Sequence, residues 1–164
     1  MARALAAAVR PVLKGCIIGS LFGVTFADQC ASVVTVDGGS MYPTLDDQQA
    51  ERALVEKHCL YRYDFSRGDV VLFRSPRNHR ELVVKRLIAL PGDWIQVPEN
   101  QEIRQIPVGH CWVEGDNSGN SLDSRFYGPV PLGLMQGKVT HVVWPPHRIG
   151  RVDRKLPEGR IMPL

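Results

Sequence analysis

The chain has 164 residues, enough to bury one core, so we expect a single domain with an appendage. Apolar residues make up 44% and charged residues 23%, which is ordinary for a folded protein. The net charge of +3 equals the charge of Arg3, Arg10 and Lys14 in an acid-free N-terminal segment, so the remainder is balanced. A neutral body argues against nucleic acid as a partner, because nucleic-acid-binding proteins usually carry a broad basic face.

Residues 11–27 read PVLKGCIIGSLFGVTFA, an apolar run with a single charge. Such a run reaches the short end of the roughly 17–25 residues that span a bilayer. We therefore expect a membrane anchor over 11–31, preceded by a basic segment over 1–10 that stays on the side of synthesis or import. A cleaved signal or transit peptide stays open, because these are also basic and free of acids. The glycines of the run disfavour a buried core helix.

After the anchor, β-branched or apolar runs separated by Gly/Pro turns predict short strands. The predicted strands cover 32–36, 67–74, 81–90, 94–97 at hairpin distance from the strand before it, 110–116 and 138–144. A polar stretch with weak helical character covers 46–58. This pattern predicts a mainly β body over 32–146, curled or barrel-like. Residues 147–164 are rich in proline and basic residues and are expected to form a surface tail.

Ser40 stands in the octet GGSMYPTL, directly after two glycines. The glycines allow a tight turn and a close approach of the backbone to a ligand. The amide of Ser40 could then donate to an oxyanion on an attacked carbonyl. A plain Gly-Gly-Ser turn explains the octet nearly as well.

Lys85 stands inside a strand that is apolar on both faces, which is typical of a strand buried on both sides. A buried lysine is costly unless it is neutral or hydrogen-bonded, and a neutral lysine can act as a base toward a serine hydroxyl. An edge lysine that reaches water, or an ion pair, are the alternatives. We expect the neighbouring Arg86 to face solvent or to form a salt bridge.

The segment 115–131, GDNSGNSLDSRFYGPVP, is dense in hydrogen-bonding side chains and is framed by predicted strands. A solvated loop with Asx turns would account for it. The functional interpretation is a support for the site, in which Ser121 orients the lysine amine while Asp123 and Arg125 hold the loop.

Other chemistries have weaker support in the sequence. No histidine lies in a nucleophile-elbow setting, and the motifs GxSxG and HExxH are both absent. There is no P-loop or dinucleotide fingerprint, so we expect neither a metal nor a cofactor. The cysteines show no CxxC spacing, and free buried thiols are favoured over a Cys59–Cys111 bridge.

Four segments resemble the ordered boxes of type I signal peptidases: GGSMYPTL, RGDVVLFRSP, VVKRLIALPGD and GDNSGNSLDSRFYGPVP. The boxes extend over residues 38–131, with the anchor ahead of them. The small size and the ending HVVWPP at 141–146 are most similar to mitochondrial inner-membrane members of the family.

The resemblance implies the β-rich signal-peptidase fold, with the substrate bound as an added strand and one N-terminal transmembrane helix. It implies that Ser40 is the nucleophile and Lys85 the general base, with Ser121 as the hydrogen-bond partner of the lysine. Asp123 and Arg125 would be the supporting pair. The residues implied to line the pockets for small substrate side chains are Val36, Met41 and Val84.

Two positions depart from the bacterial pattern. Gly38 stands where many bacterial members have a serine whose hydroxyl helps the oxyanion hole. Ser118 and Gly119 replace an Arg-Asp pair, which fits an organellar member. The endoplasmic-reticulum branch is less similar, because it carries histidine at the position of Lys85.

The sequence therefore predicts a membrane-anchored Ser-Lys endopeptidase. By resemblance, it would remove sorting signals from precursors that reach the mitochondrial intermembrane space, anchored in inner-membrane lipid by a single pass and paired with a related protease subunit. A bacterial or plastid signal peptidase is a rival within the same class. A non-catalytic partner subunit is the rival from another class, and the intact Ser40 and Lys85 argue against it. A self-cleaving repressor is disfavoured, because only 39 residues precede Ser40.

Overall fold

Short antiparallel strands form most of the regular structure in the computed structural model of the chain, which describes residues 19–20, 23, 29–97 and 102–157. The strands are β1 (Ala31–Thr35), β2 (Arg52–Glu56), β3 (Val70–Arg74), β4 (Leu82–Ala89), β5 (Trp94–Gln96), β6 (Ile103–Gln105), β7 (His110–Glu114), β8 (Val130–Pro131), β9 (Met135–Trp144) and β10 (Gly150–Arg151). The predicted mainly β body is confirmed.

Helix is confined to short pieces in the part of the chain from residue 31 onward that the structure describes. They are the 3-10 turns η1 (Gly39–Met41), η2 (Asp47–Gln49), η3 (His58–Leu60), η4 (Ser118–Asn120), η5 (Leu132–Leu134) and η6 (Pro146–Arg148), and the helix α2 (Ser124–Tyr127). No described helix has the length and hydropathy needed to cross a bilayer. The predicted segment 1–10 and most of the predicted anchor 11–31 lie outside the described residues.

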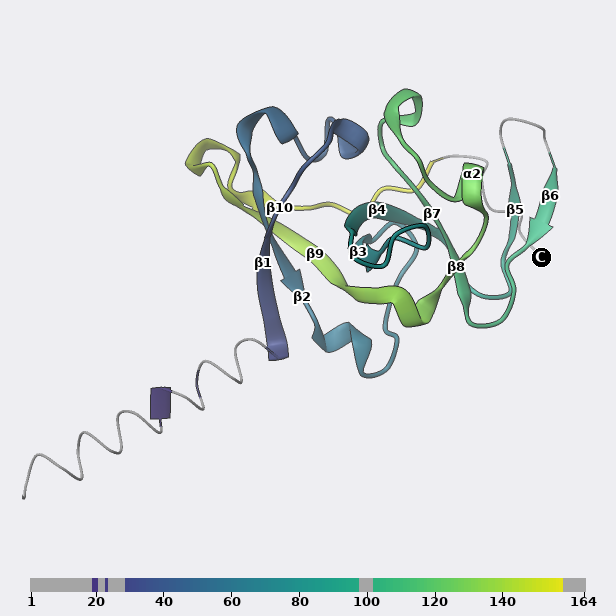
Figure 1. Cartoon of the computed structure of the whole chain (residues 1–164), viewed down its shortest axis with the longest axis horizontal. Helices are drawn as coiled ribbons and strands as arrows, with labels where there is room; N and C mark the ends of the chain where they lie inside the picture. The colour runs from purple at the N-terminus through teal and green to yellow at the C-terminus, as the bar shows by residue number, and fades with distance from the viewer. Residues whose placement is uncertain (1–18, 21–22, 24–28, 98–101, 158–164) are drawn as a thin grey trace, which may run out of the picture.

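One sheet carries the fold, with strand order β1-β2-β9-β3-β4-β7-β8 and with β10 paired to β9. Figure 1 shows that the sheet is curled, with β3 and β4 in the middle, β1 and β2 on one side and β7 and β8 on the other. Strand β9 alternates buried and less buried residues, the pattern of a strand with one face on the core. Strands β5 and β6 form a separate two-stranded sheet, so the hairpin distance between β4 and β5 does not reflect pairing.

One prediction of local structure is wrong. The stretch 46–58, expected to have weak helical character, contains strand β2, which pairs with β1 and with β9. Its buried residues, Ala53 and Val55, alternate with more exposed ones, and both belong to the core. These residues have mixed helix and strand propensities, and they form a strand because their backbone pairs with a strand on each side.

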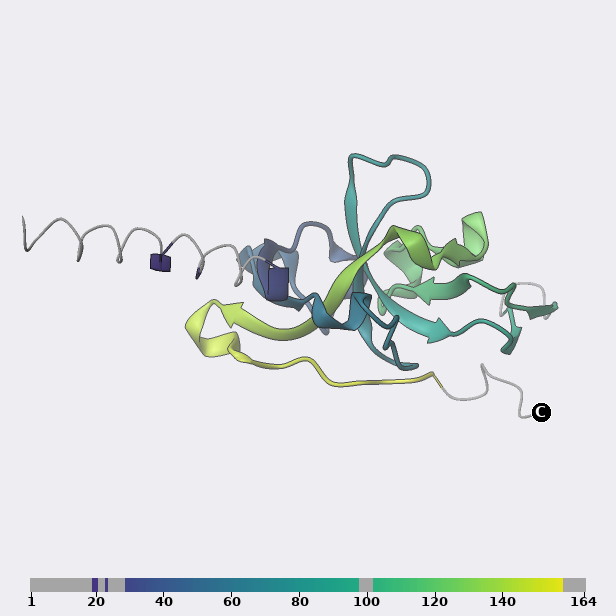
Figure 2. The same cartoon turned by 90° about the horizontal axis from the view of Figure 1, so that it is seen from below.

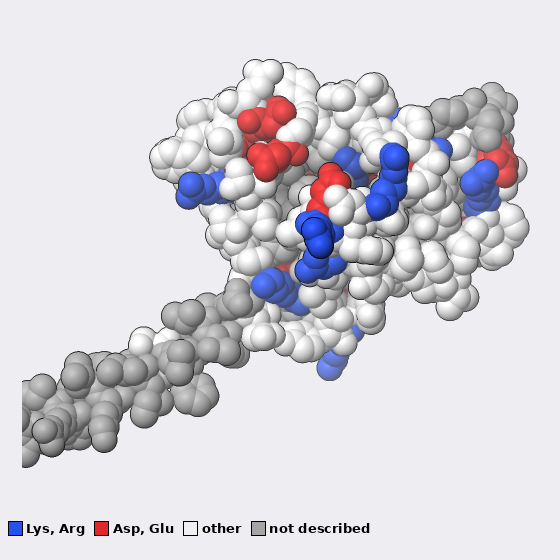
Figure 3. Space-filling view, in the orientation of Figure 1, with Lys and Arg blue, Asp and Glu red and all other residues white. Residues whose placement is uncertain are grey.

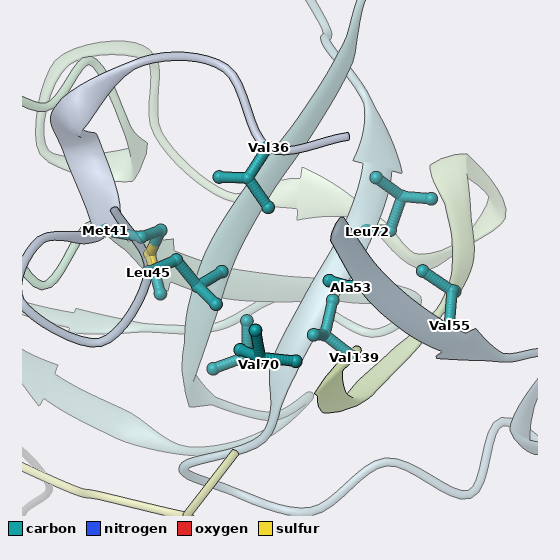
Figure 4. Close-up of a cluster of buried hydrophobic side chains, with 9 residues drawn as sticks. Val36, Met41, Leu45, Ala53, Val55, Val70, Leu72 and Val139 are labelled. Carbon is teal, nitrogen blue, oxygen red and sulfur yellow. The ribbon is translucent and has the colours of Figure 1, made fainter. Parts of the chain in front are cut away.

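Three clusters of buried side chains make up the core. Figure 4 shows the first, which lies between β1, β2, β3, β9 and the turn η1 and includes Val36, Met41, Leu45 and Leu72. The second packs β3, β4 and β7 against α2 and η3 and includes Phe73, Leu87 and Val113. The third lies under the β5–β6 hairpin, around Trp112. The first cluster sets the position of the turn that carries Ser40.

Cys59 and Cys111 are both free and buried, as the sequence favoured, and both belong to the second cluster. The Cys59 thiol donates to the carbonyl of Glu56, and the Cys111 thiol donates to the carbonyl of Val130. Burial raises the pKa of Cys59 to about 11 and that of Cys111 to about 12. These thiols therefore serve the core and take no part in the groove described below.

The segment after residue 146, predicted as a surface tail, is attached to the body over its described part. Strand β10 pairs with β9, and the amide of Val152 donates to the carbonyl of Thr140. Figure 2 shows this segment in yellow, running along one side of the body. The proline-rich and basic composition of this segment gave no sign that it attaches to the body.

Charges of opposite sign are interspersed on the described surface. Figure 3 shows Lys and Arg beside Asp and Glu on the face seen in Figure 1. Ion pairs of the described residues include Arg67 with Asp93 and Lys138 with Glu56. The balanced charge of the body is therefore also balanced locally.

Candidate active site

Ser40 lies in the tight turn η1, at the edge of the first core cluster. Gly38, just before the turn, has φ 88°, a backbone conformation that residues other than glycine rarely adopt. Met41, the next residue after Ser40, is buried in the core and anchors the turn. The serine is half-buried, and its position is fixed from both sides.

Lys85 brings its amine to the serine hydroxyl. Nζ of Lys85 lies 2.5 Å from Oγ of Ser40 and donates a hydrogen bond to that oxygen. Lys85 is only 3% exposed. The two residues are 45 positions apart in the sequence and meet because β4 runs beside the η1 turn.

The surroundings of Lys85 lower the pKa of its ammonium. The main cause is desolvation by burial, and the charge of Arg125 acts in the same direction. The charges of Asp123 and Glu81 oppose the shift without cancelling it. A lysine in this setting holds a neutral amine at lower pH than an exposed lysine does.

Asp123 is fully buried and organises the loop beside the dyad. It accepts hydrogen bonds from Oγ of Ser121 at 2.6 Å, from the amide of Gly115 at 2.9 Å and from Nε and Nη2 of Arg125 at 2.9 and 2.7 Å. Burial alone would raise the pKa of the carboxyl, but the hydrogen bonds from Arg125, Ser121 and Gly115 outweigh burial and lower it. Asp123 and Arg125, which the resemblance implies as the supporting pair, form an ion pair in this structure.

Ser121 lies in this loop with its hydroxyl directed to Asp123 rather than donated to the lysine. Within the described residues, the hydrogen bond of Lys85 goes to Ser40, and none joins Lys85 to Ser121. A role for Ser121 toward the lysine amine stays a prediction.

The start of the same loop is bound directly to the nucleophile turn, which sequence reasoning missed. The amide of Asn117 donates to the carbonyl of Ser40, and its side-chain Nδ2 donates to the carbonyl of Gly39, both at 3.0 Å. A Cβ at residue 115 would lie 2.2 Å from Oγ of Ser121 and 2.5 Å from the carbonyl oxygen of Ser40, so only glycine fits there. Local sequence patterns carry no signal for such contacts, although both residues lie inside the segment that the sequence singled out.

Arg86 is buried, not solvent-facing, and it forms the salt bridge that was the other expectation. Its guanidinium binds both oxygens of Asp116, with Nε to Oδ1 at 2.7 Å and Nη2 to Oδ2 at 2.6 Å. Asp116 also accepts from Oγ1 of Thr44 at 2.5 Å. Arg86, which follows Lys85 in the sequence, is therefore bound to Asp116, which precedes Asn117.

A groove of about 620 Å³ opens over the dyad. One wall is the chain from β1 to the η1 turn, and the other is the first half of β4. Val36, Met41 and Val84, the residues implied to line the side-chain pockets, all line this groove, with Ser40 and Lys85 between the walls. Val36 and Met41 are also core residues, so the groove wall is the outer layer of the core.

The backbone amide of Ser40 is a possible donor to a ligand. The described hydrogen bonds of Ser40 involve its hydroxyl and its carbonyl, so its amide N–H is available to a bound group. Among the residues that the structure describes, no three His, Cys, Asp or Glu side chains are grouped to hold a metal ion. The chemistry that this geometry supports is attack by the Ser40 hydroxyl with Lys85 as the proton acceptor.

Comparisons with known proteins agree with the geometry. The family model for signal peptidase, peptidase S26, matches residues 9–104 and 97–144. Mitochondrial inner membrane protease subunit 2 from Mus musculus is 38% identical over 151 residues, covering 90% of this chain and 86% of the relative. The same subunit from Saccharomyces cerevisiae is 38% identical over 145 residues, covering 84% of this chain and 81% of the relative.

Subunit 1 of the mouse protease is similar as well, with 36% identity over 135 residues, covering 80% of this chain and 77% of the relative. A crystal structure of a signal peptidase I from Enterococcus faecalis aligns with 27% identity and a TM-score of 0.40, covering 47% of this chain and 97% of the solved one. The relatives support a location at the mitochondrial inner membrane. The chain belongs to the signal peptidase family, peptidase S26, and is a serine endopeptidase of that family.

Proposed function

We propose that this chain uses Ser40 and Lys85 to remove sorting peptides from precursors delivered to the mitochondrial intermembrane space. The observation that carries the proposal is the 2.5 Å contact between a buried lysine amine and a serine hydroxyl at the base of an open groove. The similarity to inner membrane protease subunits supports the compartment.

The groove suits an extended peptide. Residues 82–85 pair with β3 on one side, whereas β7 begins to pair only at Arg86, so no strand of the described part of the chain pairs with their other backbone edge. Among the described strands, β1 pairs only with β2. A substrate strand could bind backbone groups on these walls while small side chains enter toward Val36, Met41 and Val84.

In the acylation step, the neutral amine of Lys85 takes the proton of the Ser40 hydroxyl as Oγ attacks the scissile carbonyl carbon. The oxyanion that forms accepts a hydrogen bond from the Ser40 amide. The new ammonium of Lys85 then gives its proton to the leaving nitrogen, and the peptide bond breaks. The products of this step are an ester on Ser40 and a released peptide with a free amino group.

Deacylation uses the same base. The amine of Lys85 takes a proton from water, the resulting hydroxide attacks the ester, and the proton passes to Oγ as the carboxylic acid product leaves and gives up its own proton to solvent. Gly38 has no side chain to donate a second hydrogen bond to the oxyanion. Asp123 and Arg125 support the loop beside the lysine, and Ser121 could accept a hydrogen bond from the amine while it donates to Asp123.

In the cell, the segment 11–31 would be a single-pass anchor in the inner membrane, with residues 32–146 facing the intermembrane space. The similarity to both subunit 1 and subunit 2 supports assembly with a related protease subunit. No cofactor is needed for the steps above, because Lys85 accepts and returns the transferred proton in both acylation and deacylation.

The test is cleavage of a fluorogenic precursor peptide by the purified full chain, with and without a related subunit. We expect Ser40→Ala and Lys85→Ala each to abolish cleavage, because the first removes the nucleophile and the second the base. Ser66→Ala and Lys138→Ala are matched controls, since both residues lie away from the groove, and they should retain cleavage. Robust cleavage by Lys85→Ala would refute the mechanism. An inactive parent chain beside an active partner would favour a non-catalytic subunit.

A further inference from the structure

Residues 150–155 of the C-terminal segment run along one side of the body, and we call them the strap (Figure 2). It begins as strand β10 on β9, and the Val152 amide continues the attachment through the Thr140 carbonyl at 2.9 Å. It then passes so close to the turn before β3 that a Cβ at residue 68 would lie 3.0 Å from the carbonyl oxygen of Lys155. Most strap residues are exposed, so the strap lies on the surface of the body and is fixed there by these backbone contacts.

The strap is held at Arg154 by a side-chain ion pair. Nε of Arg154 lies 2.5 Å from Oδ1 of Asp69, a carboxylate that is nearly fully buried. The other carboxylate oxygen of Asp69 accepts from the amide of Ser66, and its backbone carbonyl accepts from the amide of Leu87 in β4. The ion pair therefore joins the strap to the strand that carries Lys85.

The strap also completes the hydrogen bonds of a buried arginine. A guanidinium has five N–H groups, and those of Arg86 have five acceptors in this structure. The acceptors are the two carboxylate oxygens of Asp116, Oγ1 of Thr44, the carbonyl of Gly68 and the carbonyl of Asp153 at 3.0 Å. Only the last of these belongs to the strap, and without it Nη1 would keep a single acceptor.

Arg86 connects the strap to both members of the dyad. It follows Lys85 directly in β4, and its partner Asp116 precedes Asn117, which binds the carbonyls of Gly39 and Ser40. Movement of the guanidinium would therefore act on the base and on the nucleophile turn together. A displacement of about 1 Å at reacting atoms can cost on the order of a hundredfold in rate.

We propose that the strap is a positioning element for the reaction, which holds Ser40 and Lys85 in register through Arg86. The proposal rests on the proposed function for its kinetic readout. The strap residues touch no substrate in this account, and their effect passes through the carbonyl of Asp153 and the ion pair of Arg154. A strap released from Asp69 would let Arg86 and β4 shift and would let water reach the lysine amine.

The test is a charge series at residue 154 in the full chain, namely Arg154→Lys, Arg154→Ala and Arg154→Glu. Lysine keeps the attraction to Asp69, alanine removes it and glutamate repels it. Arg151→Glu is the matched control, because it makes the same charge change on an exposed residue of the same segment. We expect kcat to be near that of the parent for Arg154→Lys and Arg151→Glu, and to fall on the order of tenfold for Arg154→Glu with little change in KM.

A second readout separates positioning from general stability. The ionisation of Lys85, followed by NMR of the lysine side chains, should move toward an ordinary lysine pKa in Arg154→Glu and stay in place in Arg151→Glu. The charges that act on Lys85, those of Asp123, Arg125 and Glu81, are the same in both variants. Equal kcat in Arg154→Glu and Arg151→Glu overturns the proposal, and so does a lower kcat with an unchanged Lys85 pKa. If the parent itself cleaves no precursor, the proposed function fails, and the Lys85 ionisation still decides the role of the strap.

Discussion

The two halves of strand β4 differ in their neighbours. Leu82–Val84 pair with β3 and leave the other edge to the groove, whereas Arg86, Leu87 and Ala89 pair with β7. Exposure changes in step, because Leu82 is 49% exposed while every residue from Lys85 onward in the strand is buried. One strand therefore supplies a binding edge in its first half and a core element in its second.

Lys85 stands at the boundary between these halves. It is buried deeply enough for desolvation to lower its pKa, yet its amine still reaches a hydroxyl at the groove. A lysine further along β4 would lie in the core, and one nearer Leu82 would be solvated. Four tests, made with substitutions in β4 or beside it, ask whether this division between binding and core holds.

The largest effect is expected from Lys85→Met, which should lower cleavage by about a thousandfold or more because it removes the base. The same change should stabilise the fold, since it replaces a buried ammonium by an apolar chain. In the folded state the lysine pKa is lowered, so the cost of burial is greatest below that pKa and declines as pH rises toward the pKa of the unfolded chain. The free energy of unfolding in urea, measured at acidic and alkaline pH, should show a gain that shrinks at high pH. A loss of stability at low pH would contradict this account.

The second effect is expected from Arg86→Ala, which leaves the carboxylate of Asp116 without its buried partner. We expect a loss of about 3–5 kcal/mol in unfolding free energy. Arg104→Ala is the control, because Arg104 pairs with Glu102 at the exposed surface and its loss should change stability little. Similar unfolding midpoints for the two variants would show that Arg86 contributes little to the stability of the fold.

The third test compares the two halves directly through Ile88→Ala and Val84→Ala. Ile88 is buried in the third core cluster, and its truncation should cost about 2–5 kcal/mol while the folded fraction keeps its kcat. Val84 is half-buried and lines the groove, so its truncation should cost less stability and change KM for peptides that differ beside the cut. Denaturant curves and steady-state kinetics on both variants check this. A larger loss of stability in Val84→Ala, with the change in KM in Ile88→Ala, would contradict the distinction between the two halves.

The smallest effect is expected from Glu81→Gln, at the groove end of β4. The charge of Glu81 raises the pKa of Lys85, so its removal should lower that pKa further. Because cleavage needs the neutral amine, activity rises with pH through this pKa, and the rising limb of kcat/KM should move to lower pH. Glu102→Gln, remote from the groove, should leave the limb in place, and a shift to higher pH in Glu81→Gln would reverse the assigned sign.

The sequence was a good guide where local pattern and chemistry coincide. Strands β1, β3, β4, β7 and β9 lie within or close to the predicted runs, because β-branched residues between glycine and proline turns specify them. Ser40 and Lys85 could be singled out because a serine after two glycines and a lysine in an apolar strand are both unusual. The structure brings these two residues together.

Other features depend on contacts between distant residues and were missed. Strand β2 contains Ala, Leu and Glu, which favour helix, and pairing with β1 and β9 decides its state. The acceptors of Arg86 lie up to 67 positions away, and no local period predicts them. The docking of the strap was missed for the same reason, since an isolated Arg154 gives no sign that Asp69 is its partner.

The buried thiols have a consequence for the chemical environment in which this enzyme can work. Thiol–disulfide exchange proceeds through the thiolate, and Cys59 and Cys111, with pKa values of about 11 and about 12, are almost wholly protonated near neutral pH. Their slow exchange lets the second core cluster resist oxidation once the chain is folded. The packing behind β3 and β4 therefore depends little on the redox potential of the compartment.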